Sequence, residues 1–367
     1  ATMKFHRIIG WCALVAALVH PFLYESTPTT GPWPWDSTRQ FAVATDFAAI
    51  STGVIAFILL PVLVVLAVWR SSLDYRYETW RRLHGVIAAA LVGLLLHHTL
   101  AAGRYAAHET VALIWQVMAL VALLTLVQRY LISPIKQMGK PWKVSRVERL
   151  SDRQWRLSLL PDGHEGMDYQ AGQFAWLKLG RSSFSISENP FSIASAPAEG
   201  PEICFVIKEL GDFTSSLGQT EVGTRAYLDG PYGSLIVDGR SEPGVAMIAG
   251  GVGVAPMLGI LQQLKQTNDP RSHRLIYANR TEDQIVCREE LADDNPILVL
   301  SEPSEGWQGE AGLIDQTLIE RSFTDAQFAT WLFVICGPVP MMDQVSLTLK
   351  EKGVSNDRIL LERFNYD

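Results

Sequence analysis

Five of the eight histidines of this chain lie in or next to two long apolar stretches. An ionisable side chain is costly to bury in such a stretch and usually has a function there. They are His6 and His20 in the first stretch and His84, His97 and His98 in a later one. His6 and His20 are fourteen residues apart, as are His84 and His98. A fourteen-residue step along an α-helix rises about 21 Å and returns to within roughly 40° of the same face. Two facing helices would therefore present paired imidazoles at two levels.

Paired imidazoles at two levels predict two bound haems, because a haem iron with two histidine ligands needs one nitrogen donor on each side of the ring plane. A structural zinc ion would need third and fourth ligands, which neither level offers. Any single histidine could instead make an ordinary hydrogen bond between helices. Which residue of the later stretch is the second haem ligand, His97 or His98, is left open by the spacing. A straight helix favours His98, because a thirteen-residue step turns His97 roughly 140° away from His84, whereas helix rotation or a local bulge would favour His97.

Four apolar stretches must position these histidines, and they cover residues 8–24, 47–69, 83–102 and 110–127. At a rise of about 1.5 Å per residue, each reaches roughly 25–35 Å, which is the thickness of the hydrocarbon layer of a membrane. Most of the basic residues near them lie before the first stretch, between the second and third, and after the fourth; they are Lys4, Arg7, Arg70, Arg76, Arg81, Arg82, Arg129, Lys136, Lys140 and Lys143. The opposite loops, 25–46 and 103–109, contain only Arg39 and Arg104 among Lys and Arg. Because Lys and Arg are retained on the cytosolic side, residues 1–135 are predicted to be a multi-pass domain of the cell membrane, with the remainder cytosolic.

Residues 140–240 alternate short apolar strands with Gly, Pro and Asp turns, which predicts a small antiparallel barrel. The segment 189–192 offers a rigid proline, an aromatic ring and a hydroxyl that could pack on a planar ring system. The segment 208–217 offers a cation, a glycine and several hydroxyls at a helix start, which suits a pyrophosphate. A strand end and a helix cap without any flavin would look similar.

Residues 241–367 alternate apolar strands with helical segments, which predicts a parallel sheet. The glycine-rich turn 250–256 follows the first of these strands, and its glycines would let the backbone approach a diphosphate. Arg280 follows the next strand, where a guanidinium would favour the 2′-phosphate of NADPH. The alternative is a surface ion pair between Arg280 and Glu282.

The paired histidines and six short motifs resemble one family over nearly the whole chain. The motifs are Asn-Pro-Phe-Ser at 189–192, Leu-Gly-Asp-Phe-Thr at 210–214, Gly-Pro-Tyr-Gly at 230–233, the glycine turn at 250–256, Asn-Arg-Thr at 279–281 and Cys-Gly-Pro at 336–338. The family is the ferric reductase and NADPH oxidase superfamily of flavocytochromes b. The resemblance implies a multi-domain fold: an all-α transmembrane haem bundle, followed by a ferredoxin-NADP reductase-like module of an antiparallel β-barrel and an α/β parallel-sheet nucleotide domain.

Carried over residue by residue, the resemblance implies the contacts of each cofactor. It places His6 and His84 around an inner haem b, and His20 and His97 around an outer one, with His98 as the alternative to His97. The FAD contacts would be Asn189, Pro190, Phe191, Ser192, Lys208, Gly211 and Thr214. The NADPH contacts would be Gly250, Gly251, Gly253, Pro256, Arg280, Cys336, Gly337 and Pro338. Phe364 would stack over the flavin and act with Cys336 in catalysis, with Tyr366 as a second candidate for the stacked ring.

Two features depart from the family pattern. Asn189 stands where most relatives have histidine, so one hydrogen bond to the flavin is expected to differ. The family has six membrane spans and four are recognised here, so two N-terminal family spans are expected to be missing from this sequence.

The implied function is electron transfer from cytosolic NADPH, or NADH, through FAD and two haems b to oxygen on the outer face, producing superoxide. The alternatives are a ferric-chelate reductase and an electron conduit to a quinone or a periplasmic partner. The outer loop 25–46 contains no His or Cys, so it offers no evident metal-chelate site and favours oxygen. The expected partners are the lipid bilayer and this small-molecule acceptor, with no obligate protein partner. The net charge of −7 without a basic tract argues against nucleic acid.

Overall fold

The computed structural model describes residues 2–23, 47–72, 77–102 and 108–363. The chain divides into two compact units at the bond between Pro134 and Ile135. Each unit is described by itself.

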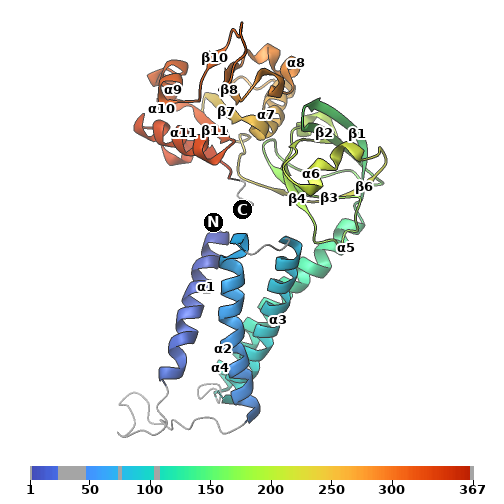
Figure 1. The fold of residues 1–367 in the computed structure, drawn as a ribbon, viewed down its shortest axis with the longest axis vertical. Helices are drawn as coiled ribbons and strands as arrows, with labels where there is room; N and C mark the ends of the chain where they lie inside the picture. Colours follow the sequence, from blue (N-terminus) through green and yellow to red (C-terminus); the bar gives the residue numbers. More distant parts are fainter. Residues whose placement is uncertain (1, 24–46, 73–76, 103–107, 364–367) are drawn as a thin grey trace. The chain divides into compact units, whose positions relative to one another are not determined.

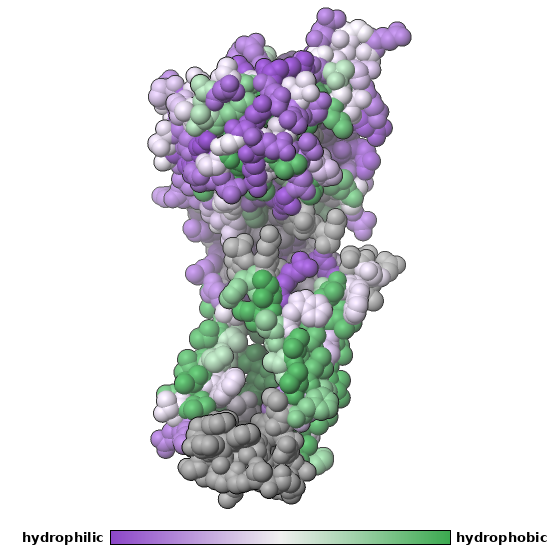
Figure 2. Space-filling model, turned by 90° about the vertical axis from the view of Figure 1, so that its left-hand side faces the viewer, coloured by the Kyte–Doolittle hydropathy of each residue, from purple (hydrophilic) through white to green (hydrophobic). Residues whose placement is uncertain are grey.

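The first unit is a bundle of long apolar helices (Figure 1). They are α1 (Thr2–Val19), α2 (Phe47–Val68), α3 (Tyr77–Ala102) and α4 (Glu109–Val127). In the described part of the chain, these four are long and apolar enough to cross a membrane. Helix α3 packs against α2 and α4, and α1 packs against α2. Large apolar side chains such as Ile8, Val54 and Leu113 point outward and are exposed, and Figure 2 shows the hydrophobic surface that they form. Such a surface requires a lipid environment.

The polypeptide leaves the bundle as one continuous helical segment. Helix α4 passes through a π-helical turn (Gln128–Ile132) into α5 (Ser133–Met138). In the second unit, the buried Gln137 of α5 accepts a hydrogen bond of 2.9 Å from the Lys178 ammonium group of the barrel. The end of this helical segment is therefore tied to the sheet that follows it.

The barrel is a six-stranded antiparallel sheet in the order β4-β3-β6-β1-β2-β5. The strands are β1 (Trp142–Ser151), β2 (Gln154–Pro161), β3 (Phe174–Leu179), β4 (Asn189–Ser192), β5 (Ile203–Lys208) and β6 (Arg225–Tyr232). The chain just after β4 meets the other edge strand, because Ala194 N donates to Cys204 O at 2.8 Å and Ile193 bridges Phe205. This contact closes the sheet around a core that includes Leu157, Leu177 and Phe205.

The nucleotide domain is a six-stranded parallel sheet in the order β10-β9-β8-β7-β11-β12. The strands are β7 (Gly244–Gly250), β8 (Ser272–Asn279), β9 (Ile297–Leu300), β10 (Glu310–Ala311), β11 (Leu332–Cys336) and β12 (Ile359–Leu361). Alternate residues of β7 point to opposite faces: Met247 packs in the cluster with α7 (Val254–Gln266), and Ile248 in the cluster with α9 (Gln316–Ser322) and α11 (Val339–Glu351). The predicted fold class, a helical membrane bundle followed by a barrel and a parallel-sheet domain, is confirmed.

Candidate functional site

Two pairs of histidines face each other, with His6 on α1, His20 in the 3-10 turn that follows α1 (His20–Leu23), and His84 and His98 on α3. The ring centroids of His6 and His84 are 6.3 Å apart with an interplanar angle of 73°. Those of His20 and His98 are also 6.3 Å apart, at 83°. Two imidazoles that share one metal ion, each nitrogen about 2 Å from it, have centroids about 6 Å apart. Both pairs therefore fit the spacing of two axial ligands. Among the residues described, no cluster of three or more His, Cys, Asp or Glu could hold a metal ion.

The structure pairs His20 with His98, the residue that the helical spacing favours. His98 Nδ1 lies 2.8 Å from the Ala49 carbonyl oxygen of α2, and since a carbonyl only accepts, Nδ1 carries the proton and Nε2 keeps its lone pair for a metal. A Cβ at Gly53 would lie 2.5 Å from His98 Cε1, so only glycine leaves room for this ring. His97, which the family resemblance favoured, instead lies with Nδ1 3.1 Å from the Thr52 hydroxyl.

The predicted flavin residues of β4 lie beside the turn that follows β5. The Phe191 ring stacks on Phe213 of α6 (Asp212–Ser215), with centroids 6.1 Å apart. Asn189 and Pro190 pair with β3, and Ser192 is buried. The Thr214 hydroxyl accepts hydrogen bonds from the amides of Leu210 (2.8 Å) and Gly211 (3.0 Å). The two segments are therefore together, but these two amides already have an acceptor in the protein.

The predicted nucleotide residues gather at the carboxyl edge of the parallel sheet, because β7 and β11 are neighbours. A Cβ at Gly253 would lie 2.2 Å from the Cys336 carbonyl oxygen, and one at Gly250 would lie 2.8 Å from Pro338 Cδ. Gly337, at φ 157°, has its Cβ position 2.9 Å from Gly250 N. Glycine is required wherever the two backbones approach so closely. Pro256 is buried in the first turn of α7, where its missing N–H has no helical partner to lose.

Arg280 follows β8 at the same edge, but its ionic partner differs from the one considered from the sequence. Its Nε donates to Glu302 Oε2 at 3.0 Å, and both side chains are exposed. Glu282 instead pairs with Arg288 at 2.7 Å. Sequence reasoning missed Glu302, which follows β9. The signal that could have found it is that neighbouring parallel strands end at one edge of the sheet.

The Glu362 carboxyl acts electrostatically on the buried Cys336 thiol, an interaction that sequence reasoning did not predict. Burial, together with the nearby Glu362 charge, raises the pKa of the Cys336 thiol to about 12, so this thiol is not a thiolate nucleophile. Burial also raises the pKa of Glu362 to about 7. Its Oε1 lies 3.0 Å from the Cβ position of Gly233 in the barrel, which has no side chain to displace it. Phe364 and Tyr366, predicted to cover the flavin, lie outside the described residues.

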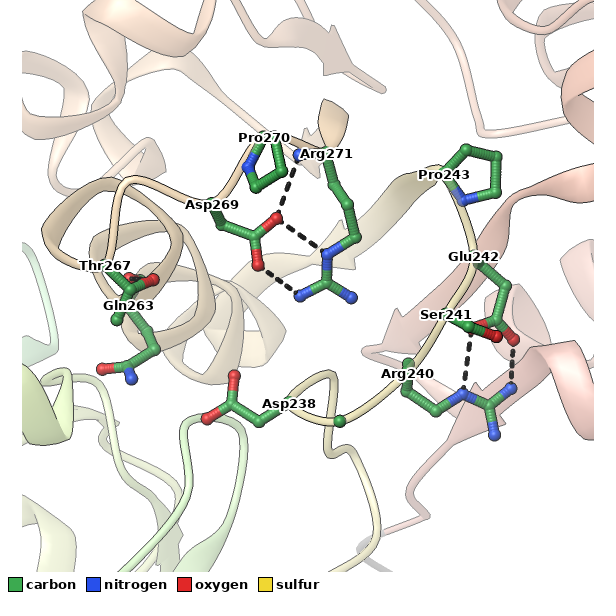
Figure 3. Close-up of a pocket in the computed structure, with 11 residues that line it drawn as sticks. Asp238, Arg240, Ser241, Glu242, Pro243, Gln263, Thr267, Asp269, Pro270 and Arg271 are labelled. Atoms are coloured by element: carbon green, nitrogen blue, oxygen red, sulfur yellow. Dashed lines mark hydrogen bonds and ion pairs between the residues drawn. The ribbon is translucent and has the colours of Figure 1, made fainter.

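A separate pocket opens at the amino edge of the parallel sheet, between the loop before β7 and the end of α7 (Figure 3). Its two arginines are each held by a neighbouring acid: Arg271 bonds Asp269 at 2.7 Å, and Arg240 Nε bonds Glu242 at 3.2 Å. It contains none of the predicted site residues.

Comparison with known proteins matches both halves of the chain. A family model described as a ferric reductase like transmembrane component matches residues 1–95, and one described as an oxidoreductase NAD-binding domain matches residues 247–346. The reductase component of propane 2-monooxygenase from Mycolicibacterium goodii is 30% identical over 221 residues, which are 57% of this chain and 62% of that protein. The electron transfer subunit of a probable dihydroorotate dehydrogenase B (NAD(+)) from Thermococcus kodakarensis is 31% identical over 205 residues, 55% of this chain and 76% of that protein.

Solved structures share the fold of the second unit. The ferredoxin reductase in carbazole 1,9a-dioxygenase is 23% identical with a TM-score of 0.54, covering 61% of this chain and 69% of that chain. The cytochrome b5 reductase domain of Ulva prolifera nitrate reductase is 20% identical with a TM-score of 0.54, covering 62% and 98%. The chain spans less than two thirds of the propane 2-monooxygenase reductase.

Proposed function

This chain belongs to the ferric reductase and NADPH oxidase superfamily, and on that premise we propose that it carries electrons from cytosolic NADPH through FAD and two haems b to oxygen on the outer face. Its product would be superoxide. The observation that carries the proposal is the equal 6.3 Å separation of the rings in the two histidine pairs. Membership of this superfamily makes the chain a membrane oxidoreductase that takes electrons from NAD(P)H.

The two histidine pairs would hold the haems, with His6 and His84 at the inner level and His20 and His98 at the outer level. Helices α1 and α3 fix both separations, and Ala49 fixes the tautomer of His98. When bound, FAD supplies the conversion of a two-electron hydride into single electrons, which haem iron takes one at a time.

The second unit would orient the flavin and the nicotinamide nucleotide. The stacked Phe191 and Phe213 rings hold β4 against the turn 208–214, which gives the flavin a rigid floor. Gly251, whose Cβ position meets nothing within 4 Å, would leave the backbone of the turn after β7 open to a diphosphate at the start of α7. Arg280 would bind the 2′-phosphate, because a dianion makes a stronger charge-assisted contact than an exposed ion pair with Glu302.

Oxygen is the proposed acceptor, since the loop 25–46 carries no His or Cys that would hold ferric iron. A ferric chelate, a quinone or a periplasmic partner are the alternatives. The flanking Lys and Arg residues support a cytosolic second unit. The partners in this proposal are the bilayer and oxygen, without an obligate protein.

The test is NADPH-driven cytochrome c reduction by the purified, haem-loaded protein with added FAD, in air, with and without superoxide dismutase. We expect dismutase to abolish the signal. A signal that is insensitive to dismutase, together with anaerobic reduction of ferric chelates, would instead establish a ferric reductase. NADPH oxidation that appears only when a quinone is added would establish a conduit.

A further inference from the structure

The two histidine pairs have the same ring separation but different surroundings on α3. The His98 imidazole is held by the hydrogen bond between Nδ1 and Ala49 O. His84 Nδ1 is buried and has no hydrogen-bond partner among the described residues. A metal-ligating histidine usually donates its second ring N–H to a carbonyl, a carboxylate or water, which fixes the ring orientation. Something else must therefore fix the plane of His84.

The neighbour in the right place is Trp80, one helical turn before His84 on the same face of α3. The two ring centroids are 5.2 Å apart and the planes are inclined by only 33°. Trp80 is itself held from the other side, because Tyr77 lies 5.6 Å from it at 31°. The Arg70 guanidinium lies 5.2 Å from the centroids of both Tyr77 and Trp80. Arg70, Tyr77 and Trp80 form a stack, here called the aromatic clamp, that ends on the His84 imidazole.

We propose that Trp80 is a positioning residue that sets the plane of the His84 imidazole by stacking, as the Ala49 carbonyl does for His98 by hydrogen bonding. This inference rests on the proposed haem sites. A hydrogen bond at Nδ1 raises the basicity of a histidine ligand and so favours the ferric state. His98 has that bond and His84 lacks one among the described residues. Judged from these two ligands, the haem at the His6–His84 level would have the higher midpoint potential of the two.

The test compares four full-length, haem-loaded proteins: wild type, Trp80→Ala, Trp80→Phe and Trp115→Ala. Trp115 is an outward-facing tryptophan of α4 and serves as the matched control. Haem content, the two midpoint potentials and the low-spin ferric electron paramagnetic resonance signals are measured for each. His84→Ala and His98→Ala, which each remove one ligand, assign the two potentials to the two levels.

In Trp80→Ala, the space left beside His84 admits water to Nδ1, and the ring is free to turn. We expect the higher of the two midpoint potentials to fall. A tenfold change in the relative stability of the two iron oxidation states corresponds to about 59 mV. The electron paramagnetic resonance signal of the same haem should also shift. Trp80→Phe should restore both, because a phenyl ring still stacks, and Trp115→Ala should match wild type.

Two outcomes would overturn the inference: a Trp80→Ala protein with both haems and unchanged potentials and signals, or a Trp80→Phe protein that behaves like Trp80→Ala. Loss of a single haem in Trp80→Ala that Trp80→Phe prevents would support it, since the phenyl ring restores a flat face against the His84 imidazole. A wild-type protein that binds no haem would refute the proposed haem relay itself, which haem content reports before any variant is compared.

Discussion

At the scale of single residues, His97 and His98 are neighbours in sequence but contact different partners. His98 faces His20 across the bundle, whereas His97 faces the hydroxyl of Thr52. His98→Ala is therefore expected to lower the haem content from two to one per chain, and His97→Ala to leave two. The pyridine haemochrome assay measures both. The opposite pattern would show that the 13-residue spacing of the family also holds here.

In the proposed NADPH site, Arg280 and Glu302 would set opposing preferences at the ribose. Arg280→Ala should lower the ratio of kcat/KM for NADPH to that for NADH by about tenfold or more, because a charge-assisted contact to a phosphate contributes about 1.5–3 kcal/mol. Glu302→Gln should raise the ratio severalfold, since it removes the carboxylate that pairs with Arg280. Arg288→Ala, which loses only its pair with Glu282, is the control. An unchanged ratio in Arg280→Ala would mean that the 2′-phosphate binds elsewhere.

Glu362 predicts a pH dependence of stability. Burial raises its pKa to about 7, so between the unfolded pKa of about 4.5 and this value the native protein binds more protons than the unfolded one. Stability should therefore fall as pH rises through this window, by at most about 3 kcal/mol. Glu362→Gln should flatten the fall in melting temperature between pH 5 and pH 8, and Glu305→Gln, at an exposed position, should not. Equal slopes in wild type and Glu362→Gln would contradict the prediction.

Sequence reasoning named candidate site residues but few of the partners that the fold gives them. Helical spacing alone favours His98, and the glycines around 250 follow from the need for close backbone approach. The roles of Glu302 and Ala49, and the electrostatic effect of Glu362 on Cys336, depend on segments far apart in sequence. No local pattern reveals such pairs, because they arise when strands and helices pack.

At the scale of elements, the turn between β7 and α7 packs closely against the end of β11. Gly253→Ala would place a Cβ 2.2 Å from the Cys336 carbonyl oxygen, so the backbone must shift. We expect a loss of about 2 kcal/mol or more and a higher KM for the nucleotide. Gly251→Ala meets nothing within 4 Å and carries only the strain of φ 55°, about 1 kcal/mol. Thermal unfolding and steady-state kinetics of the two variants compare them; equal effects would show that backbone strain, rather than crowding, governs this turn.

The parallel sheet was predictable because its strands are short apolar runs separated by helices, and β7 is buried along its whole length. A barrel was also predicted, but the two segments that close it were not, since the bond between Ala194 and Cys204 joins strand ends that carry no distinctive sequence signal. The π-helical turn after α4 likewise has no marker such as proline within Gln128–Ile132.

At the scale of the whole molecule, the chain joins an apolar bundle to a charged second unit. This arrangement predicts that electrons cross the membrane in one direction, which can be measured. In proteoliposomes, NADPH added outside reaches only molecules whose second unit faces outward. If electrons cross the bilayer, cytochrome c trapped in the lumen is reduced. Superoxide dismutase trapped with it should abolish the signal, whereas dismutase outside should not.

His98→Ala should stop the luminal signal, because the outer histidine pair is broken. It should leave the reduction of external ferricyanide by NADPH intact, since that reaction needs only the second unit. Suppression by external dismutase alone would place oxygen reduction on the side of the second unit, and the histidine pairs would then not form a path across the membrane.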